Sequence, residues 1–342
     1  MSADHKTVKL FATTGTEYLA DKVEQELQHR LPKHAWDYSV ERGRHEVSCF
    51  SNENIVVQVD NVRDHIALVL HTQAPPVNDG LIELLAMLDA INNAHPRQTF
   101  VVFPYMPYSR SDRKNRPRIS VMGQRLPEIL NKVMGVHRVM LLEPHNGQIK
   151  QYFSPTADEV PMVPLLVNHI RDAFLKRWPA NECTLVFADA GAAKRFEHVP
   201  ASLGLDPTYI YKTRADHSES PMINAVMGNV RGKHCFILDD EILTGGTVVR
   251  DAETLKESGA ASVTVLAVHG VLADQRLAEG ELMKKLSACA VDEFVITDSI
   301  PVADKVSQAP NFTVIPAAPL IAEACARLIV GDSLSEMHRA SV

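Results

Sequence analysis

Two adjacent carboxylates and a glycine-containing turn follow an apolar run at 236–238. The segment carries, in order, Asp239, Asp240, Thr244, Gly245, Gly246 and Thr247. Glycine permits backbone conformations closed to other residues, and the first N–H groups of the helix expected at 248–258 lack partners within that helix. With the threonine hydroxyls they make a cradle for a phosphate monoester. Because the carboxylates can bind sugar hydroxyls or a metal ion, the segment predicts a sugar-phosphate site; an ordinary strand-to-helix turn is the alternative.

A dense group of cations follows the strand-like run 99–104. Its members are Arg110, Arg113, Lys114, Arg116 and Arg118, and Asp112 is the only acid among them. Proteins with parallel sheets bind ligands at the C-terminal edge of the sheet, and arginine forms bidentate contacts with phosphate oxygens. The position therefore favours a polyphosphate clamp, with a solvated basic loop as the alternative.

Three other strand-like runs end in polar side chains. The residues concerned are His145 after 139–142, Asp189 at the end of 184–189, and Lys212 and Arg214 after 209–211. Cations placed where negative charge develops are the main aid to phosphoryl transfer, so the last pair suits a catalytic role. A surface histidine and a solvated strand end are the alternatives. The sequence contains no GxxxxGK[ST] loop, so a nucleotide would not be held in that manner.

Strand-like and helix-like runs alternate along the chain and position these groups. The strand-like runs are 8–13, 66–71, 99–104, 138–142, 184–189, 235–239, 262–269 and 293–297, and the helix-like runs are 17–30, 79–93, 165–176, 248–258 and 272–286. Such alternation implies βαβ units and parallel sheets. We expect two α/β domains that meet near 154–163, a peripheral loop at 30–44, and a helix cap at Asn78 or Asp79.

Composition narrows the class of protein. Of the 342 residues, 45% are hydrophobic and 23% are charged, which is typical of a globular protein. The net charge of −7 argues against nucleic-acid binding, and no apolar run approaches the ~20 residues that span a bilayer. The first residues lack an apolar signal core, so we expect a cytoplasmic location. Five scattered cysteines without a CxxC pair favour reduced thiols.

Several segments resemble motifs of the phosphoribosyl pyrophosphate synthetases, also called ribose-phosphate diphosphokinases. The cradle at 244–247 is similar to their ribose-phosphate loop, which type I phosphoribosyltransferases share. The segments at 74–85, 104–114, 143–153, 187–195 and 298–304 match synthetase motifs in the same order. Those before residue 160 would have no explanation in a phosphoribosyltransferase, so the resemblance favours the synthetases.

Three departures from the family pattern indicate a divergent member. Leu243 stands where the family usually has an acid, and Ser111 replaces a glutamine of the ATP motif. The family's adenine loop, Phe-Ser-Asp-Gly-Glu, is matched only in part by Phe50–Asn54. An asparagine can still form hydrogen bonds with a base, so we expect ATP as the nucleotide.

The resemblance implies an α/β fold with two phosphoribosyltransferase type I-like domains, each a central, mainly parallel sheet flanked by helices. It places an ATP-side domain at 1–158, a domain with the ribose-phosphate loop at 159–316, and a helix and tail at 317–342. In the family the adenine loop reaches a neighbouring subunit. The resemblance therefore implies a homo-oligomer, either a dimer or a multiple of dimers.

The activity implied by the resemblance is transfer of the β,γ-diphosphoryl group of magnesium-ATP to the 1-hydroxyl of ribose 5-phosphate, which gives phosphoribosyl pyrophosphate and AMP. The resemblance assigns ATP binding to Phe50, Asn52, Asn54, Arg110, Ser111, Asp112, Lys114 and His145. It assigns ribose 5-phosphate binding to Asp189, Asp239, Asp240, Thr244, Gly245, Gly246 and Thr247. Mg²⁺, or Mn²⁺, would be bound by His145 and Asp189, and Lys212 and Arg214 would stabilise the transition state.

Two related functions remain as alternatives. One is a diphosphokinase for a modified ribose 5-phosphate acceptor, because Leu243 makes the pocket less polar than an acid would. The other is a non-catalytic, synthetase-associated regulatory subunit. Such proteins typically lose the catalytic cations or the metal ligands, both of which this chain keeps.

Overall fold

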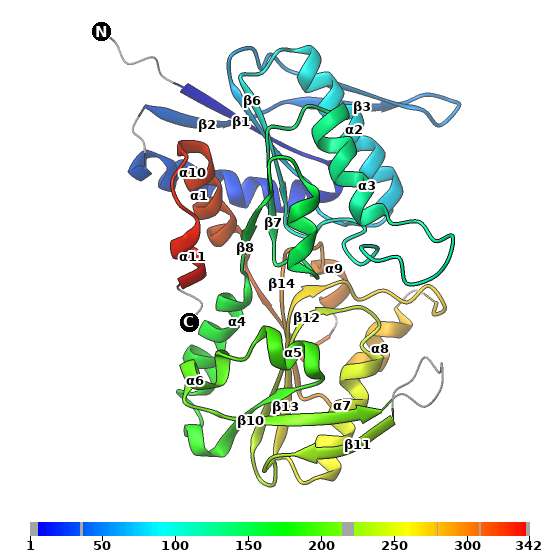
Figure 1. The fold of residues 1–342 in the computed structure, drawn as a ribbon, viewed down its shortest axis with the longest axis vertical. Coiled ribbons are helices and arrows are strands. Elements are labelled where there is room, and N and C mark those ends of the chain that lie inside the picture. Colours follow the sequence, from blue (N-terminus) through cyan, green and yellow to red (C-terminus); the bar gives the residue numbers. More distant parts are fainter. Residues whose placement is uncertain (1–5, 35–36, 214–221, 279, 308, 340–342) are drawn as a thin grey trace. The chain divides into compact units, whose positions relative to one another are not determined.

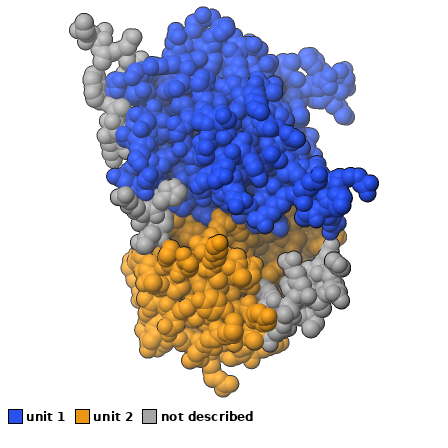
Figure 2. Space-filling view, viewed as in Figure 1, with its two compact units in different colours: residues 1–162, 299–301, 316–339 blue, residues 163–298, 302–315, 340–342 orange. Residues whose placement is uncertain are grey.

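The computed structural model describes residues 6–34, 37–213, 222–278, 280–307 and 309–339. The chain divides into two compact units, which are coloured separately in Figure 2. Unit 1 contains the described residues of 1–162, 299–301 and 316–339, and unit 2 contains those of 163–298 and 302–315. The domain boundaries expected from the sequence, at 158/159 and 316/317, stay a prediction.

Unit 1 is built on a parallel sheet. The strand order is β2 (Tyr38–Arg42), β1 (Lys6–Ala12), β5 (Ile66–Leu70), β6 (Gln98–Phe103), β7 (Arg138–Leu142) and β8 (Asp158–Val160). Every residue of β5 is buried, as expected for a central parallel strand that is covered on both faces. A separate antiparallel hairpin consists of β3 (His45–Cys49) and β4 (Ile55–Val59).

Helices cover both faces of this sheet (Figure 1). They are α1 (Glu17–His34), α2 (Val77–Asn93), α3 (Met122–Glu128), α10 (Ala318–Val330) and α11 (Ser335–Arg339), with helical turns η1 (Thr14–Thr16), η2 (Ile129–Val133) and η3 (Gly147–Tyr152). On one face, Phe11 and Val69 belong to the same buried cluster as Leu84 of α2. The late helix α10 lies beside α1, where Arg30 pairs with Glu323 at 3.4 Å.

Unit 2 contains a second, mainly parallel sheet. The strand order is β11 (Met222–Met227), β10 (Asp206–Thr213), β9 (Cys183–Phe187), β12 (His234–Ile242), β13 (Ser262–Gly270), β14 (Glu293–Thr297) and β15 (Phe312–Ile315). The edge strand β11 pairs antiparallel with β10, and the other pairs are parallel. This arrangement places the carboxyl ends of β9, β12, β13 and β14 at one edge of the sheet.

The helical segments of unit 2 are short apart from α7. They are α4 (Val163–His169), α5 (Ala190–Arg195), α6 (Val199–Leu203), α7 (Gly246–Glu257), α8 (Glu281–Ser287) and α9 (Ala303–Val306), with η4 (Ile170–Phe174) and η5 (Ala180–Glu182). Val248 and Leu255 of α7 pack in one buried cluster with Val265 of β13. The predicted α/β fold with mainly parallel sheets flanked by helices is confirmed. Within the described ranges, no helix combines the length and apolarity needed to cross a membrane.

The expectation of a peripheral loop at 30–44 is wrong. Helix α1 continues to His34, and β2 joins the sheet of unit 1 in parallel with β1, with Val40 opposite Val8. An edge strand pairs on one side only, and Val40 alone in β2 is buried. The polar residues around Val40 therefore show no strand-like apolar pattern in the sequence.

Two other local expectations are also wrong. The helix expected at 272–286 begins only at Glu281, and the carboxylate of Asp274 accepts the Arg276 N–H at 3.0 Å, a local bond that competes with helix formation. Helix α2 has Pro76 at its N-cap position, without a side-chain cap from Asn78 or Asp79. The Asn78 side chain instead accepts a hydrogen bond from the Tyr108 hydroxyl.

Candidate functional site

The Thr-Gly-Gly-Thr segment lies where β12 gives way to α7. Gly245 has φ +71°, and a Cβ atom at this position would lie 2.6 Å from Leu286 Cδ2, so the turn requires glycine here. The Gly246 N–H lies 3.4 Å from Thr244 Oγ1, and both Gly246 and Thr247 are exposed. The first turn of α7 therefore presents its N–H groups at the surface, where they can bind an anion.

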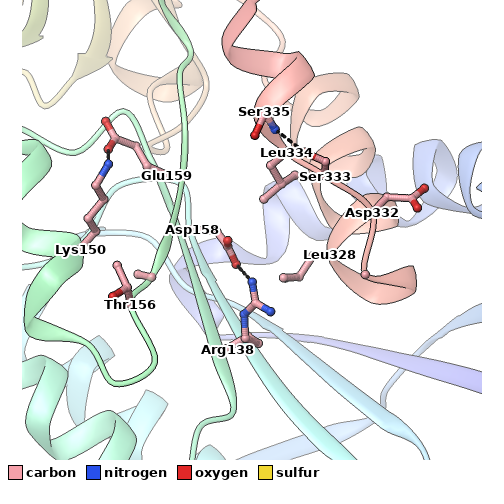
Figure 3. A pocket seen from close by; sticks show the side chains of 12 residues that line it. Arg138, Lys150, Thr156, Asp158, Glu159, Leu328, Asp332, Ser333, Leu334 and Ser335 are labelled. Carbon is pink, nitrogen blue, oxygen red and sulfur yellow. Dashed lines mark hydrogen bonds and ion pairs between the residues drawn. The ribbon is translucent and has the colours of Figure 1, made fainter.

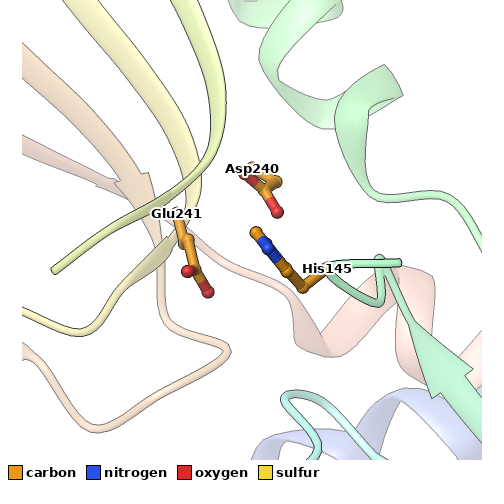
Figure 4. Close-up of side chains that lie close together, drawn as sticks. All are labelled: His145, Asp240 and Glu241. Atoms are coloured by element: carbon orange, nitrogen blue, oxygen red, sulfur yellow. The ribbon is translucent and has the colours of Figure 1, made fainter. Parts of the chain in front are cut away.

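Strand β12 carries three consecutive acidic residues just before this turn. Figure 4 shows two of them, Asp240 and Glu241. The Asp240 N–H donates to Asp239 Oδ1 at 2.9 Å, and Arg195 Nη1 donates to Asp240 Oδ2 at 3.1 Å. Burial raises the pKa of Asp239 well above its ordinary value, and the charges of Asp240 and Asp189 raise it further. These aspartates are close enough to repel one another.

Three aspartates of unit 2, Asp189, Asp239 and Asp240, form a donor set that fits a divalent cation. Strands β9 and β12 are neighbours, so Asp189 after β9 and Asp239 and Asp240 in β12 come to the same edge of the sheet. Asp189 Oδ1 accepts the Ala192 N–H at 2.8 Å and caps α5, which uses one of several acceptor positions of its carboxylate. Arg195 offsets part of the negative charge. Mg²⁺ prefers oxygen ligands, so these residues fit it.

The backbone of one of the two predicted catalytic cations, Lys212, lies in the edge hairpin of unit 2. The backbone of Lys212 is part of β10, opposite Ile223 of β11, and the register shifts between Tyr211 and Lys212. Such irregularities redirect side chains and are common beside active sites. Arg214 and the polar stretch 215–220 lie outside the described residues, so their predicted role stays a prediction.

Two loops of unit 1 are joined by a side-chain hydrogen bond. Asn146 Nδ2, after β7, donates to Asp112 Oδ2, after β6, at 2.5 Å. Arg110 and Lys114 are exposed on the first loop, and His145 is half-buried on the second (Figure 4). The structure thus brings two of the predicted ATP-binding segments together within unit 1. Sequence reasoning missed Asn146, although its place beside His145 after a strand marks it as a candidate.

The backbone of the first loop is fixed against α3. The Gly123 N–H donates to the Ser111 carbonyl at 2.9 Å, and a Cβ atom on Gly123 would lie 2.9 Å from that same oxygen. The Ser111 N–H donates in turn to the Tyr108 carbonyl at 2.9 Å. Close packing therefore holds Ser111, while the side chain of Arg110 extends to the surface.

The predicted adenine loop forms the tip of the β3–β4 hairpin, which extends beyond the helices of unit 1 (Figure 1). The Phe50 N–H donates to the Asn54 carbonyl at 2.8 Å, and the Asn52 side chain accepts the Asn54 N–H at 3.2 Å. Glu53 has φ +68°, a turn conformation that the family's glycine would adopt without strain. Phe50 is 56% exposed, so its ring is available for contact with a ligand or another chain.

A cavity of about 450 Å³ in unit 1 is lined by none of the predicted site residues (Figure 3). The edge strand β8 and the segment after α10 line it. Arg138 pairs with Asp158 at 2.5 Å, and Lys150 pairs with Glu159 at 2.6 Å, so its principal charges are matched to one another. No sequence motif indicated this cavity, and its paired charges give it no preference for a phosphate ligand.

Comparisons with known proteins identify the family. Residues 8–134 match the model of the N-terminal domain of ribose phosphate pyrophosphokinase, and residues 207–339 match the phosphoribosyl synthetase-associated domain. The ribose-phosphate pyrophosphokinases of Brucella melitensis and Bradyrhizobium diazoefficiens are each 32% identical to this chain, over 331 and 338 residues. These matches cover 96% and 98% of this chain and 99% of each relative. The chain belongs to the ribose-phosphate pyrophosphokinase family.

The family assignment confirms the resemblance seen in the sequence motifs. A solved structure agrees with it as well: phosphoribosylpyrophosphate synthetase from Mycobacterium smegmatis matches with a TM-score of 0.82 at 30% identity. That match covers 95% of this chain and 100% of the other. The family relationship therefore extends over nearly the whole chain, and includes the segments that carry the predicted site.

Proposed function

We propose that this chain is an enzyme, a ribose-phosphate diphosphokinase, which transfers the β,γ-diphosphoryl group of ATP to the 1-hydroxyl of ribose 5-phosphate. The products are phosphoribosyl pyrophosphate and AMP. The observation that carries the proposal is the anion cradle at Thr244–Thr247, directly after acidic β12, in a chain whose near full-length relatives are ribose-phosphate pyrophosphokinases.

Unit 2 supplies the groups that suit the sugar phosphate. The N–H groups at the start of α7 and the hydroxyls of Thr244 and Thr247 would bind the 5-phosphate. Asp239 and Asp240 would accept hydrogen bonds from the ribose hydroxyls. The bond from Arg195 to Asp240 at 3.1 Å supports this role, because it holds the carboxylate in place before the sugar binds.

Unit 1 supplies groups that suit ATP. Arg110 and Lys114 are exposed cations at the carboxyl end of β6, and His145 follows β7. We assign the triphosphate to these three residues, with Asp112 and Ser111 shaping the loop. The base is assigned to the hairpin tip, where Phe50 offers an exposed ring and Asn52 and Asn54 offer amides. A purine base can stack on the ring and accept hydrogen bonds from the amide N–H groups.

The proposed reaction needs no covalent nucleophile on the protein. The 1-hydroxyl oxygen of the sugar attacks the β-phosphorus of ATP, the bond from that phosphorus to the oxygen shared with the α-phosphate breaks, and the hydroxyl proton leaves to solvent. Lys212 and Arg214 would neutralise charge that develops on the transferred group and on AMP. Asp189 and His145 would help to hold Mg²⁺ or Mn²⁺, which would supply positive charge to offset that of the phosphates.

The assembly and location follow from the same proposal. The exposed hairpin tip at Phe50–Asn54 suits contact with a second copy, so we propose a homo-oligomer, either a dimer or a multiple of dimers. A cytoplasmic location fits an enzyme whose substrates are ATP and a sugar phosphate. No nucleic acid or membrane takes part in the proposed reaction.

The proposal is tested by measuring AMP formation from magnesium-ATP with and without ribose 5-phosphate. AMP that appears only with the sugar supports the proposal. Ribose 5-phosphate derivatives with larger substituents, tested in parallel, identify a modified acceptor if one of them gives a higher kcat/KM. Absence of sugar-dependent AMP with every acceptor would contradict the proposal and favour the regulatory-subunit alternative.

A further inference from the structure

The backbone after β13 is hydrogen-bonded to the residues that precede the proposed phosphate cradle at Thr244–Thr247. We call residues 271–273 the bracing segment. The Leu272 N–H donates to the Ile242 carbonyl at 3.1 Å, and the Ala273 N–H donates to the Leu243 carbonyl at 3.0 Å. Ile242 and Leu243 directly precede Thr244, the first residue of the cradle. The entry of the chain into the cradle is therefore fixed by its bonds to the bracing segment.

Leu272 holds a backbone conformation that its side chain disfavours. Its φ is +47°, in the left-handed region, where Cβ crowds the following carbonyl oxygen. The side chain is 4% exposed and belongs to the buried cluster of unit 2. A non-glycine residue keeps such a conformation only where its surroundings hold it, and these positions concentrate at functional sites. The bracing segment must therefore be held by contacts on more than one side.

Lys305 of α9 supplies the contact on the carbonyl side. Its Nζ donates to the Val271 carbonyl at 2.8 Å and to the Leu272 carbonyl at 3.2 Å. The side chain is half-buried, and burial lowers the pKa of the ammonium from its ordinary value. Hydrogen bonds from a charged donor are stronger than neutral ones, and partial burial strengthens them further. Leu272 is thus bonded through both its N–H and its carbonyl.

We propose that Lys305 is a positioning residue for ribose 5-phosphate. By holding the carbonyls of Val271 and Leu272, its ammonium keeps the bracing segment in the conformation that sets Leu243 and Thr244 for the 5-phosphate. The inference rests on the proposed function of the cradle. Lys305 acts through the backbone of the bracing segment, so its loss weakens sugar-phosphate binding and leaves ATP binding unchanged.

The test compares Lys305→Met, which removes the donors, with Lys305→Arg, which keeps them. Ribose 5-phosphate affinity is measured by calorimetry, and KM for each substrate is measured by AMP formation. We expect Lys305→Met to raise Kd and KM for the sugar phosphate about 10-fold and to leave the KM for ATP within about twofold. Lys305→Arg should restore most of the affinity. Amide hydrogen exchange at Leu272 and Ala273 should be faster in Lys305→Met.

Lys256→Met is the matched control. Lys256 also donates to a backbone carbonyl, that of Ala261 at 3.2 Å, but at the C-terminal end of α7, where it also pairs with Asp292 at 2.7 Å. Its substitution should leave ribose 5-phosphate affinity and the exchange at Leu272 unchanged.

Three results separate the possible failures. Unchanged ribose 5-phosphate affinity in Lys305→Met would overturn the role of Lys305. Equal losses for ATP and the sugar phosphate, without rescue by Lys305→Arg, would also overturn it, because they indicate general damage to the fold. Failure of the unsubstituted protein to bind ribose 5-phosphate would instead contradict the proposed function of the cradle, on which the inference rests.

Discussion

We assign two segments to phosphate-bearing substrates: the cradle of unit 2 at Thr244–Thr247, and the loop of unit 1 that carries Arg110 and Lys114, which we call the cation loop. The two segments are built differently. The first presents backbone N–H groups, with Gly245 packed against Leu286 and Leu243 bonded to Ala273. The second presents long side chains, Arg110 and Lys114, that extend from a fixed backbone to the surface.

The difference separates two ways of binding phosphate. A backbone cradle is ordered before the ligand arrives, so little conformational entropy is lost on binding. Long arginine and lysine side chains have many rotamers, and each loses rotamer freedom when it binds a phosphate. We therefore expect a small backbone change to damage the cradle more than loss of one side chain damages the cation loop.

Among the substitutions, the largest effect is expected from Gly245→Ala. The substitution places a Cβ atom in a backbone with φ +71°, 2.6 Å from Leu286 Cδ2, so the turn must shift. We expect kcat/KM for ribose 5-phosphate to fall about 100-fold, because misplacement by about 1 Å has effects of that size. Gly204→Ala is the control: Gly204 also has a positive φ, +66°, but a Cβ atom there meets nothing within 4 Å. Equal kinetic losses in the two variants would show that the loss does not depend on the position of Gly245 in the cradle.

The metal requirement tests the proposed roles of Asp189 and His145 in holding the metal ion. Excess chelator should abolish activity, and Mg²⁺ or Mn²⁺ should restore it. Asp189→Asn keeps a side chain that can cap α5 but removes the charge, so the Mg²⁺ concentration for half-maximal activity should rise about 10-fold. His145→Ala should shift it in the same direction. Activity that persists in excess chelator would contradict the proposed metal dependence.

A smaller effect is expected from the cation loop of unit 1. Arg110→Ala should raise the KM for ATP about 10-fold and leave that for ribose 5-phosphate within about twofold, because one charged hydrogen bond to phosphate is lost. Arg125→Ala is the control, since Arg125 is an exposed arginine of the same unit that lies on α3, where it pairs with Glu128 at 2.7 Å. An Arg110 loss as large as that of Gly245→Ala would break the contrast between the two loops.

The smallest effect is expected at the hairpin tip. Phe50→Ala should raise the KM for ATP about threefold, because one exposed aromatic contact with the base is lost. Val56→Ala on the same hairpin, where Val56 is 46% exposed, serves as the control. If the tip binds ATP of a second copy, specific activity should also fall on dilution as the oligomer dissociates. A monomer by light scattering that keeps full activity at nanomolar concentration would contradict this role.

The sequence predicted the elements whose apolar runs are continuous. The bounds expected for β7 and β14 agree with the structure, because buried parallel strands leave an unbroken apolar run. It failed at β2, an edge strand in which Val40 alone is buried, and at 272–280, where Asp274 forms a local turn with Arg276. In β2 a long-range pairing with β1 formed despite the polar sequence, and at Asp274 a local bond outweighed the apolar pattern.

Motifs could indicate candidate site residues but not the contacts that hold them. The bond between Asn146 and Asp112 joins residues 34 positions apart, and Lys305 reaches carbonyls 34 and 33 positions earlier. A sequence pattern does not show which distant carbonyl an ammonium will meet, since the sheet order decides it. The strain at Leu272 is likewise visible only in the backbone.

The central claim is that a diphosphoryl group is transferred as one unit to the sugar bound at the cradle of unit 2. Phosphorus NMR of the protein with magnesium-ATP and ribose 5-phosphate tests it most directly. The claim predicts equal amounts of AMP and of a sugar that carries a diphosphate on carbon 1 and keeps its 5-phosphate. Formation of ADP with a sugar bisphosphate, or consumption of ATP that does not depend on ribose 5-phosphate, would contradict it.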